Sequence, residues 1–173
     1  MIRVLLTLAA AFALTTPAQA NYEIKGVLAV EGPMRPGDYY WDESGVPAGE
    51  IVITADLTAQ TISVFRSGYE IGTAVITYGT DDKPTPTGVY PITQKRARHV
   101  SSLYGVPMPY MQRLTGDGIS IHGADVAPNV GTHGCIGVPT AFAKLLFGVT
   151  KLGDRVIITD GEMLAAGGAI TAR

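Results

Sequence analysis

Short runs of β-branched and aromatic residues, separated by glycine and proline, recur along most of the sequence. The clearest runs are residues 51–54, 61–65 and 69–78. Val, Ile, Thr and aromatic side chains favour strands, and the 21 glycines and 11 prolines of the chain place turns between the runs. These three runs predict two β-hairpins. The fold class is therefore mainly β, with further strands expected at residues 87–93, 109–114, 118–122 and 155–159.

A single segment has the periodicity of a helix. Pro139 stands near its start, where a missing backbone N–H is tolerated, and Gly148 stands near its end. The apolar side chains that recur at helical spacing between them are Phe142, Leu145, Leu146 and Val149. One short amphipathic helix is therefore expected after residue 138.

Residues 1–20 have the features of a secretory signal peptide. Arg3 provides the positive start, residues 4–14 an apolar core, and Ala18-Gln19-Ala20 a small-residue cleavage site. The apolar core is shorter than the roughly 20 residues needed to cross a bilayer, so no stable membrane insertion is expected after cleavage. The sequence therefore predicts an exported protein of the periplasm or cell envelope, with an uncleaved anchor as the alternative.

Composition divides the mature chain into three segments. Residues 21–49 are too dense in glycine and proline for long regular elements and are expected to form an irregular N-terminal segment. The aromatic cluster at residues 39–41 is expected to pack on the domain, with a sugar-stacking platform as the alternative. Residues 50–159 hold the predicted strands and helix, and residues 160–173 are expected to be a tail with little to bury.

Charge argues against nucleic acid as a partner. Removing Arg3, the one charged residue among residues 1–20, from the 13 basic residues leaves 12 against 15 acidic residues, a net charge of −3. Neither sign dominates, and the sequence has no basic stripe with interleaved aromatic residues. A content of 46% hydrophobic and 16% charged residues is typical of a globular protein.

The chain has one cysteine, Cys135, which lies in the glycine-rich stretch Gly131-Thr132-His133-Gly134-Cys135-Ile136-Gly137. Structural cysteines of exported proteins come in pairs, so a single thiol forms an intermolecular bridge, is buried and inert, or is reactive. The glycines leave the turn without Cβ atoms and let backbone N–H groups approach a ligand closely. This setting favours a reactive thiol over a buried one.

Two histidines lie close to this cysteine in the sequence. Residues 118–123 alternate apolar and polar side chains like a short strand, which carries His122 to its end. His133 lies two residues before Cys135, so an extended backbone places both on one side. A strand-end histidine can hold its ring over the sulfur and leave the substrate side open. His122 is therefore the predicted base, and His133 a supporting residue of a thiol acyl-transfer site.

The sequence around these residues resembles the L,D-transpeptidase catalytic domain of bacterial cell-wall enzymes. That family has a strand-end His-Gly followed by a Ser/Thr-His-Gly-Cys turn, which correspond here to His122-Gly123 and to residues 132–135. The resemblance extends to residues 85–88, to residues 108–110 and to the closing helix and strand, so it covers about residues 50–159. It implies a β-sandwich of mixed sheets with one short helix after the cysteine turn.

The resemblance also implies a site and a reaction. Cys135 is the implied nucleophile and His122 its base. The implied site-shaping residues are Thr132, His133, Gly134 and Gly123. The implied reaction moves an acyl group from a peptidoglycan tetrapeptide stem: D-Ala leaves, a thioester forms on the cysteine, and an acceptor amine resolves it into a cross-link. Backbone N–H groups around Gly134 would stabilise the oxyanion. No metal or other cofactor is implied, and carbapenems are the implied inhibitors.

The chain departs from the family pattern at Gly137, where that pattern places an arginine. A substrate stem carries free carboxylates, which a net charge of −3 would repel unless cationic groups stand nearby. Residues 94–109 form a long connection that is expected to act as a lid, and they carry the densest basic cluster, with a solvated loop as the alternative. The candidate substrate-binding residues are Arg96 and Arg98, with Lys95 in the same cluster, and Tyr110 and Arg113.

Three alternatives to transpeptidation stay open at this point. Water could resolve the same thioester, which would make the protein an L,D-carboxypeptidase or an amidase that cleaves cross-links or lipoprotein links. The fold could serve as a non-catalytic peptidoglycan-binding module, which Gly137 favours. The third alternative is a metal site, although closed zinc sites usually recruit paired cysteines. Its ligands would be His122, His133, Cys135 and Asp125.

Overall fold

The computed structural model describes residues 22–80, 82–161 and 169–170. The predicted signal peptide, residues 1–20, lies outside the described residues, as do residues 162–168 and 171–173 of the predicted tail. Within the described residues, no helix has the length and apolar character needed to cross a membrane.

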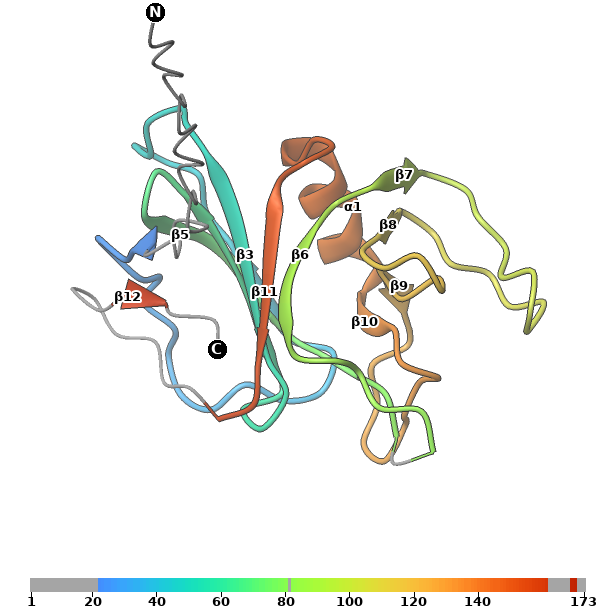
Figure 1. The fold of residues 1–173 in the computed structure, drawn as a ribbon. Helices are drawn as coiled ribbons and strands as arrows, with labels where there is room; N and C mark the ends of the chain where they lie inside the picture. Colours follow the sequence, from blue (N-terminus) through green and yellow to red (C-terminus); the bar gives the residue numbers. More distant parts are fainter. Residues whose placement is uncertain (1–21, 81, 162–168, 171–173) are drawn as a thin grey trace, which may run out of the picture.

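A six-stranded mixed sheet forms one side of the domain (Figure 1). Its strands, in spatial order, are β2 (Tyr39–Trp41), β5 (Tyr69–Val75), β4 (Thr61–Arg66), β3 (Ile51–Asp56), β11 (Arg155–Thr159) and β6 (Gly88–Pro91). β3, β4 and β5 pair antiparallel in sequence order, which confirms the two predicted hairpins. β11 is parallel to β3 and antiparallel to β6, so the last strand of the domain lies between its first hairpin and the segment after residue 87.

The second sheet has four strands, one of which begins at the cysteine turn. Its strands, in spatial order, are β10 (Ile136–Pro139), β9 (Ser120–Ala124), β8 (Met111–Arg113) and β7 (Gln94–Arg96). β10 is parallel to β9, whereas β9, β8 and β7 pair antiparallel. Both sheets therefore contain parallel and antiparallel pairs, which confirms the predicted mainly β fold of mixed sheets.

Two short strands near the ends of the described chain pair with each other. β1 (Tyr22–Glu23) is antiparallel to β12 (Ala169–Ile170). The segments expected to lack long regular elements, residues 21–49 and 160–173, thus contribute β1, β2 and β12. Short pairings of this kind give backbone N–H and C=O groups the partners that they require.

The one helix in the described residues is α1 (Thr140–Val149), in the position predicted from its apolar spacing. Its buried side chains are Phe142, Ala143 and Leu146. Leu145 is 37% exposed, because the buried stripe is narrower than predicted and passes beside it. Gly148 lies near the end of the helix, as predicted: α1 ends at Val149, and the backbone N–H of the C-cap residue, Thr150, donates to the carbonyl oxygen of Leu146.

The main core lies between the six-stranded sheet and a layer made of α1 and the second sheet (Figure 1). Phe142 of α1 is fully buried and lies edge-on to Trp41, with 5.5 Å between ring centroids, and to Tyr39, with 6.1 Å. Two of the three rings at residues 39–41 therefore pack on the domain, as predicted. This packing fixes α1, and α1 lies against β9, the strand that carries His122.

Candidate active site

The parallel pairing of β9 and β10 brings the predicted nucleophile and the predicted base to neighbouring strands. The register sets Ile136 against Ile121, so Cys135, the residue before β10, continues this register beside Ser120. His122 follows two residues later in β9. β9 runs on for two residues beyond this histidine, so the ring projects from within the strand and not, as predicted, from its end.

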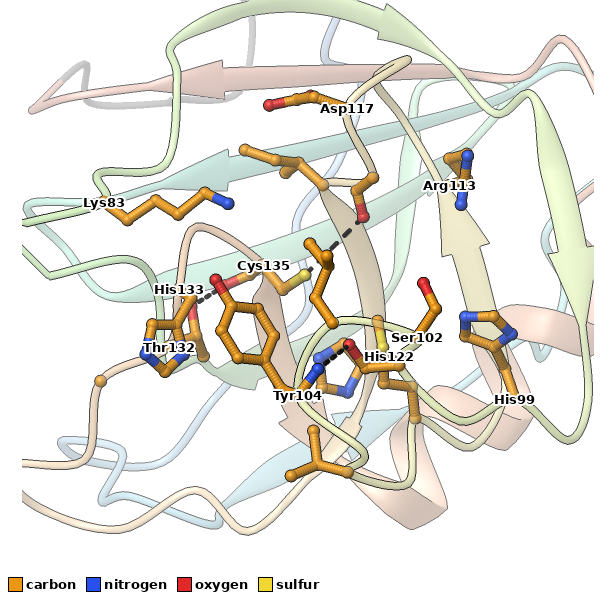
Figure 2. Close-up of a pocket in the computed structure, with 17 residues that line it drawn as sticks. Lys83, His99, Ser102, Tyr104, Arg113, Asp117, His122, Thr132, His133 and Cys135 are labelled. Atoms are coloured by element: carbon orange, nitrogen blue, oxygen red, sulfur yellow. Dashed lines mark hydrogen bonds between the residues drawn. The ribbon is translucent and has the colours of Figure 1, made fainter.

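A cavity of about 300 Å³ holds both side chains at its wall (Figure 2). The predicted site residues that line it are Cys135, His122, His133, Thr132 and Arg113. The cavity also has wall residues that sequence reasoning did not assign to the site, including Lys83, His99, Tyr104 and Asp117. It therefore lies where the cysteine turn, β9 and the connection between β7 and β8 meet.

Cys135 is partly buried at the wall of this cavity. Its Sγ lies 4.0 Å from the carbonyl oxygen of Gly118. Burial raises the pKa of the thiol above its usual value, whereas the backbone N–H of Ser120 and the ammonium group of Lys83 act to lower it. Because burial is the largest influence, the thiol is protonated in the resting site at neutral pH.

His122 is only 8% exposed. Its Nδ1 lies 3.0 Å from the carbonyl oxygen of Gly123, so an Nδ1–H donates to that carbonyl and Nε2 is left to accept a proton. Burial lowers the pKa of the imidazole, and the hydrogen bond to Gly123 offsets part of this effect. A neutral imidazole in the same cavity as a protonated thiol is suited to accept the thiol proton during attack.

His133 is exposed and stacks on Tyr104 of the connection between β7 and β8. The ring centroids are 4.3 Å apart and the planes meet at 17°. The Nζ of Lys83 lies 5.9 Å from the centre of the same tyrosine ring. Tyr104 thereby joins the predicted lid to the cysteine turn, and His133 is placed to hold the mouth of the cavity.

The cysteine turn is supported by the segment that precedes β6. Gly134 is buried and has a φ of +96°, a left-handed conformation that residues with a side chain rarely adopt. The hydroxyl of Thr85 accepts a hydrogen bond from the N–H of Gly79 and donates one to the carbonyl oxygen of Gly134, both at 2.9 Å. Thr132 donates from its hydroxyl to the carbonyl oxygen of Cys135. Thr85 is thus a supporting residue that the sequence indicated only as part of the family resemblance.

The position where the family pattern places an arginine has no room for a side chain. A Cβ atom at Gly137 would lie 2.6 Å from Cγ2 of Thr77 and 2.9 Å from Cβ of Ala124. Gly137 and Thr77 also exchange two backbone hydrogen bonds, at 2.8 and 2.9 Å. Glycine is therefore required where β10 meets the segment that follows β5.

We expect Gly137→Arg to destabilise the domain by about 1–3 kcal/mol, the usual cost of inserting atoms into a packed site. Urea unfolding followed by circular dichroism measures this difference. Gly148→Ala is a matched control, because an added Cβ in α1 meets nothing within 4 Å, and it should stabilise the domain by about 0.5–1 kcal/mol. A Gly137→Arg protein as stable as the wild type would show that Thr77 and Ala124 yield to a side chain.

The basic cluster of the predicted lid lies away from the cavity. Arg96 belongs to β7, the outer strand of the second sheet, and Arg98 follows it; both are exposed and neither lines the cavity. The Nζ of Lys95 donates to the carbonyl oxygen of Phe147 near the end of α1, at 2.7 Å. The strand that carries these residues therefore directs the cluster to solvent and to the helix end.

Tyr110 also lies outside the cavity, because its ring packs on Phe147 with 5.8 Å between centroids. Arg113, two strands from Cys135 in the same sheet, does line the cavity. Of the predicted substrate-binding residues Arg96, Arg98, Tyr110 and Arg113, only Arg113 lines the cavity, and substrate binding by each of them stays a prediction.

The described part of the chain contains no cluster of side chains that would support the alternative of a metal site. No group of three or more His, Cys, Asp or Glu side chains is placed there to hold a metal ion. Asp125, the fourth ligand considered above, does not line the cavity.

The chain matches the family model of the L,D-transpeptidase catalytic domain (YkuD) over residues 50–158. Among solved structures, an L,D-transpeptidase from Stackebrandtia nassauensis is 27% identical, with a TM-score of 0.60 and coverage of 66% of this chain and 58% of that chain. An L,D-transpeptidase in complex with imipenem is 25% identical, with a TM-score of 0.59 and coverage of 63% and 58%. One from Enterococcus faecium is 26% identical, with a TM-score of 0.56 and coverage of 64% and 50%.

The chain thus spans between half and three fifths of the length of these structures. Among curated proteins, none matches it. The region of the family match contains the cysteine turn, α1, β9 and β10. The resemblance noted in the sequence is confirmed, and the chain belongs to the L,D-transpeptidase catalytic domain family.

Proposed function

We propose that the protein is a peptidoglycan L,D-transpeptidase that uses Cys135 as its nucleophile and His122 as its base. The observation that carries this proposal is the parallel pairing of β9 and β10, which brings the two side chains to one cavity. The family match supports the class of enzyme. The proposed donor substrate is a tetrapeptide stem that ends in D-Ala.

In the first step, the thiol of Cys135 gives its proton to Nε2 of His122 while the sulfur attacks the carbonyl carbon before D-Ala. A C–S bond forms, and negative charge moves to the carbonyl oxygen, where backbone N–H groups of the cysteine turn stabilise it. The intermediate then collapses with cleavage of the C–N bond. His122 returns the proton to the leaving amine of D-Ala, and a thioester remains on Cys135.

In the second step, an amine of a neighbouring stem attacks the thioester carbonyl. His122 takes a proton from this amine, the C–S bond breaks, and the sulfur leaves and recovers its proton. The product is a new amide cross-link between the stems. A thiol is nucleophilic enough to perform both steps without a metal ion.

The lowered pKa of His122 predicts how the rate of acylation depends on pH. His122 acts as a base only when unprotonated, and burial lowers its pKa below the usual value of about 6.5. The enzyme should therefore be active above pH 6.5, and its activity should be lost as the pH falls through the lowered pKa of His122 in the folded protein. We expect kcat/KM for D-Ala release to rise with pH through a midpoint below about 6.5. A midpoint above that value would show that the site stabilises the imidazolium form, against this account.

The proposed place of action is the cell envelope, in the periplasm. Residues 1–20 have the features of a signal peptide, and the proposed substrate belongs to the cell wall. Carbapenems are proposed as covalent inhibitors of Cys135, because a similar enzyme was solved in complex with imipenem.

Products formed from a purified disaccharide tetrapeptide test the proposed function. After incubation with residues 21–173, mass spectrometry should detect a cross-linked dimer together with free D-Ala. Tripeptide without dimer would assign the thioester to hydrolysis, as in an L,D-carboxypeptidase, and conversion of added dimer to monomers would assign a cross-link amidase. If none of these products forms, the fold serves as a non-catalytic binding module.

A further inference from the structure

The cavity contains a cationic side chain without an acidic partner. Arg113 is the last residue of β8 and pairs with Ser120 of β9. Its side chain lines the cavity with His122 and Cys135, and Figure 2 shows it on the opposite side from Lys83. Among the described residues, its Nε is buried without a hydrogen-bond partner, and no ion pair includes it.

The acidic residue that lines the cavity, Asp117, does not neutralise this arginine. Asp117 is exposed and accepts a hydrogen bond from the hydroxyl of Thr115, and within the described ranges no ion pair joins it to Arg113. A partly buried guanidinium without a partner is unfavourable by itself, and its parallel N–H donors match the two oxygens of a carboxylate. The substrate cavity therefore offers an anion-binding group that the protein itself leaves unused.

The sheet register indicates how far the backbone of Arg113 lies from that of Cys135. Arg113, Ser120 and Cys135 occupy successive positions across β8, β9 and the start of β10. Neighbouring strands lie about 4.8 Å apart, so the backbones of Arg113 and Cys135 are separated by about 10 Å. An extended peptide covers this distance in about three residues. A carboxylate held by Arg113 therefore belongs to a residue close to the attacked carbonyl.

We propose that Arg113 binds a free carboxylate of the donor peptide and so sets which carbonyl lies over Cys135. This inference rests on the proposed function, because it assigns the ligand of a residue in the same cavity. Arg113 would thus supply a carboxylate-binding side chain in a chain that has glycine, Gly137, where the family pattern places an arginine. The carboxylate belongs either to the terminal D-Ala or to an internal residue of the stem, and the experiment separates the two.

Equilibrium binding to a protein that cannot form the thioester tests this proposal. In a Cys135→Ala background, calorimetry measures the Kd of the tetrapeptide with free carboxylates and of two versions, one amidated at the terminal and one at the internal carboxylate. Adding Arg113→Gln should raise the Kd of the free peptide by about 10 to 150-fold, the range expected for a hydrogen bond between charged groups. The amidated peptide whose Kd does not respond to Arg113→Gln identifies the carboxylate that Arg113 binds.

Two further variants control for effects on the fold. Arg98→Gln makes the same change at an exposed arginine outside the cavity and should leave every Kd unchanged. Arg113→Lys keeps the charge but loses the paired donors, so its Kd should lie between those of the parent and of Arg113→Gln. Thermal unfolding of each variant verifies that the compared proteins are folded.

Three results would overturn the proposal: no loss of affinity in Arg113→Gln, an equal loss for the free and both amidated peptides, or no binding by the Cys135→Ala parent. The proposed function can fail separately. Binding that depends on Arg113, in a protein whose wild type forms no thioester, would refute the transpeptidase and leave the carboxylate site standing. If the wild type forms the thioester but Arg113→Gln changes neither Kd nor KM, the transpeptidase would stand and the carboxylate site would be refuted.

Discussion

Cys135→Ala is expected to lower the rate of D-Ala release from a tetrapeptide by at least about 10⁴-fold. The sequence contains no second cysteine, so no other thiol can replace this one. The side chain is partly exposed at the cavity wall, so its loss should leave the fold intact. A coupled assay for free D-Ala gives the rate, and circular dichroism shows whether the variant is folded.

Cys135→Ser is the matched variant for this experiment. It keeps a side chain of nearly the same shape, but a hydroxyl is a much weaker nucleophile than a thiol at neutral pH. It should therefore bind the tetrapeptide with the affinity of the wild type and release almost no D-Ala. If Cys135→Ala kept turnover within tenfold of the wild type, the nucleophile would have to be another residue.

His122→Ala is expected to lower the same rate by about 10²–10⁴-fold, the usual effect of removing a positioned general base. The thiol of Cys135 has a raised pKa, so without a base it gives little thiolate at neutral pH. The deficit should shrink as the assay pH rises toward ionisation of the thiol. Rates of D-Ala release across this pH range test both statements.

His133→Ala provides the comparison for this variant. His133 is exposed and stacked on Tyr104, whereas His122 is buried with its Nδ1 at a backbone carbonyl. We therefore expect His133→Ala to reduce the rate by less than about tenfold, because it removes the stacking on Tyr104 at the cavity and does not remove the group that transfers the proton. An inactive His133→Ala protein beside an active His122→Ala protein would exchange the two roles.

Much of the fold could be predicted because its determinants are local. The β-rich runs and turn residues within residues 51–78 specify two hairpins, and the spacing of Phe142 and Leu146 specifies α1. The exposure of Leu145 could not be predicted in this way, because it depends on which neighbours pack against the helix. The periodicity of apolar residues predicts which face of a helix is buried, but it does not predict how wide the buried face is.

The predicted pair of Cys135 and His122 lies in one cavity, but the reason is a parallel strand pairing that the sequence does not display. The ionisation state of the sulfur also depends on the assembled domain, because burial in the folded cavity raises the pKa of the thiol. In the proposed mechanism, His122 is therefore needed to take the proton from the thiol of Cys135 during the reaction.

Charge density along the chain did not indicate which arginine lines the cavity. Arg96 and Arg98 are close in sequence but lie on or beyond an outer strand, where they face solvent. Arg113 stands apart from them in the sequence and faces the cavity, because β8 is next to β9. The supporting contacts of Thr85 and Tyr104 are likewise long-range, which explains why no local pattern reveals their roles.

Mass spectrometry can detect the proposed acyl-enzyme on Cys135 directly. Wild-type protein mixed with tetrapeptide and quenched in acid during turnover should show, by intact mass, an increase equal to the substrate less D-Ala. Proteolysis should place this increase on the peptide that contains Cys135, and hydroxylamine should remove it, as expected for a thioester. Release of D-Ala without any added mass at Cys135, or the same added mass on the Cys135→Ala protein, would contradict the mechanism.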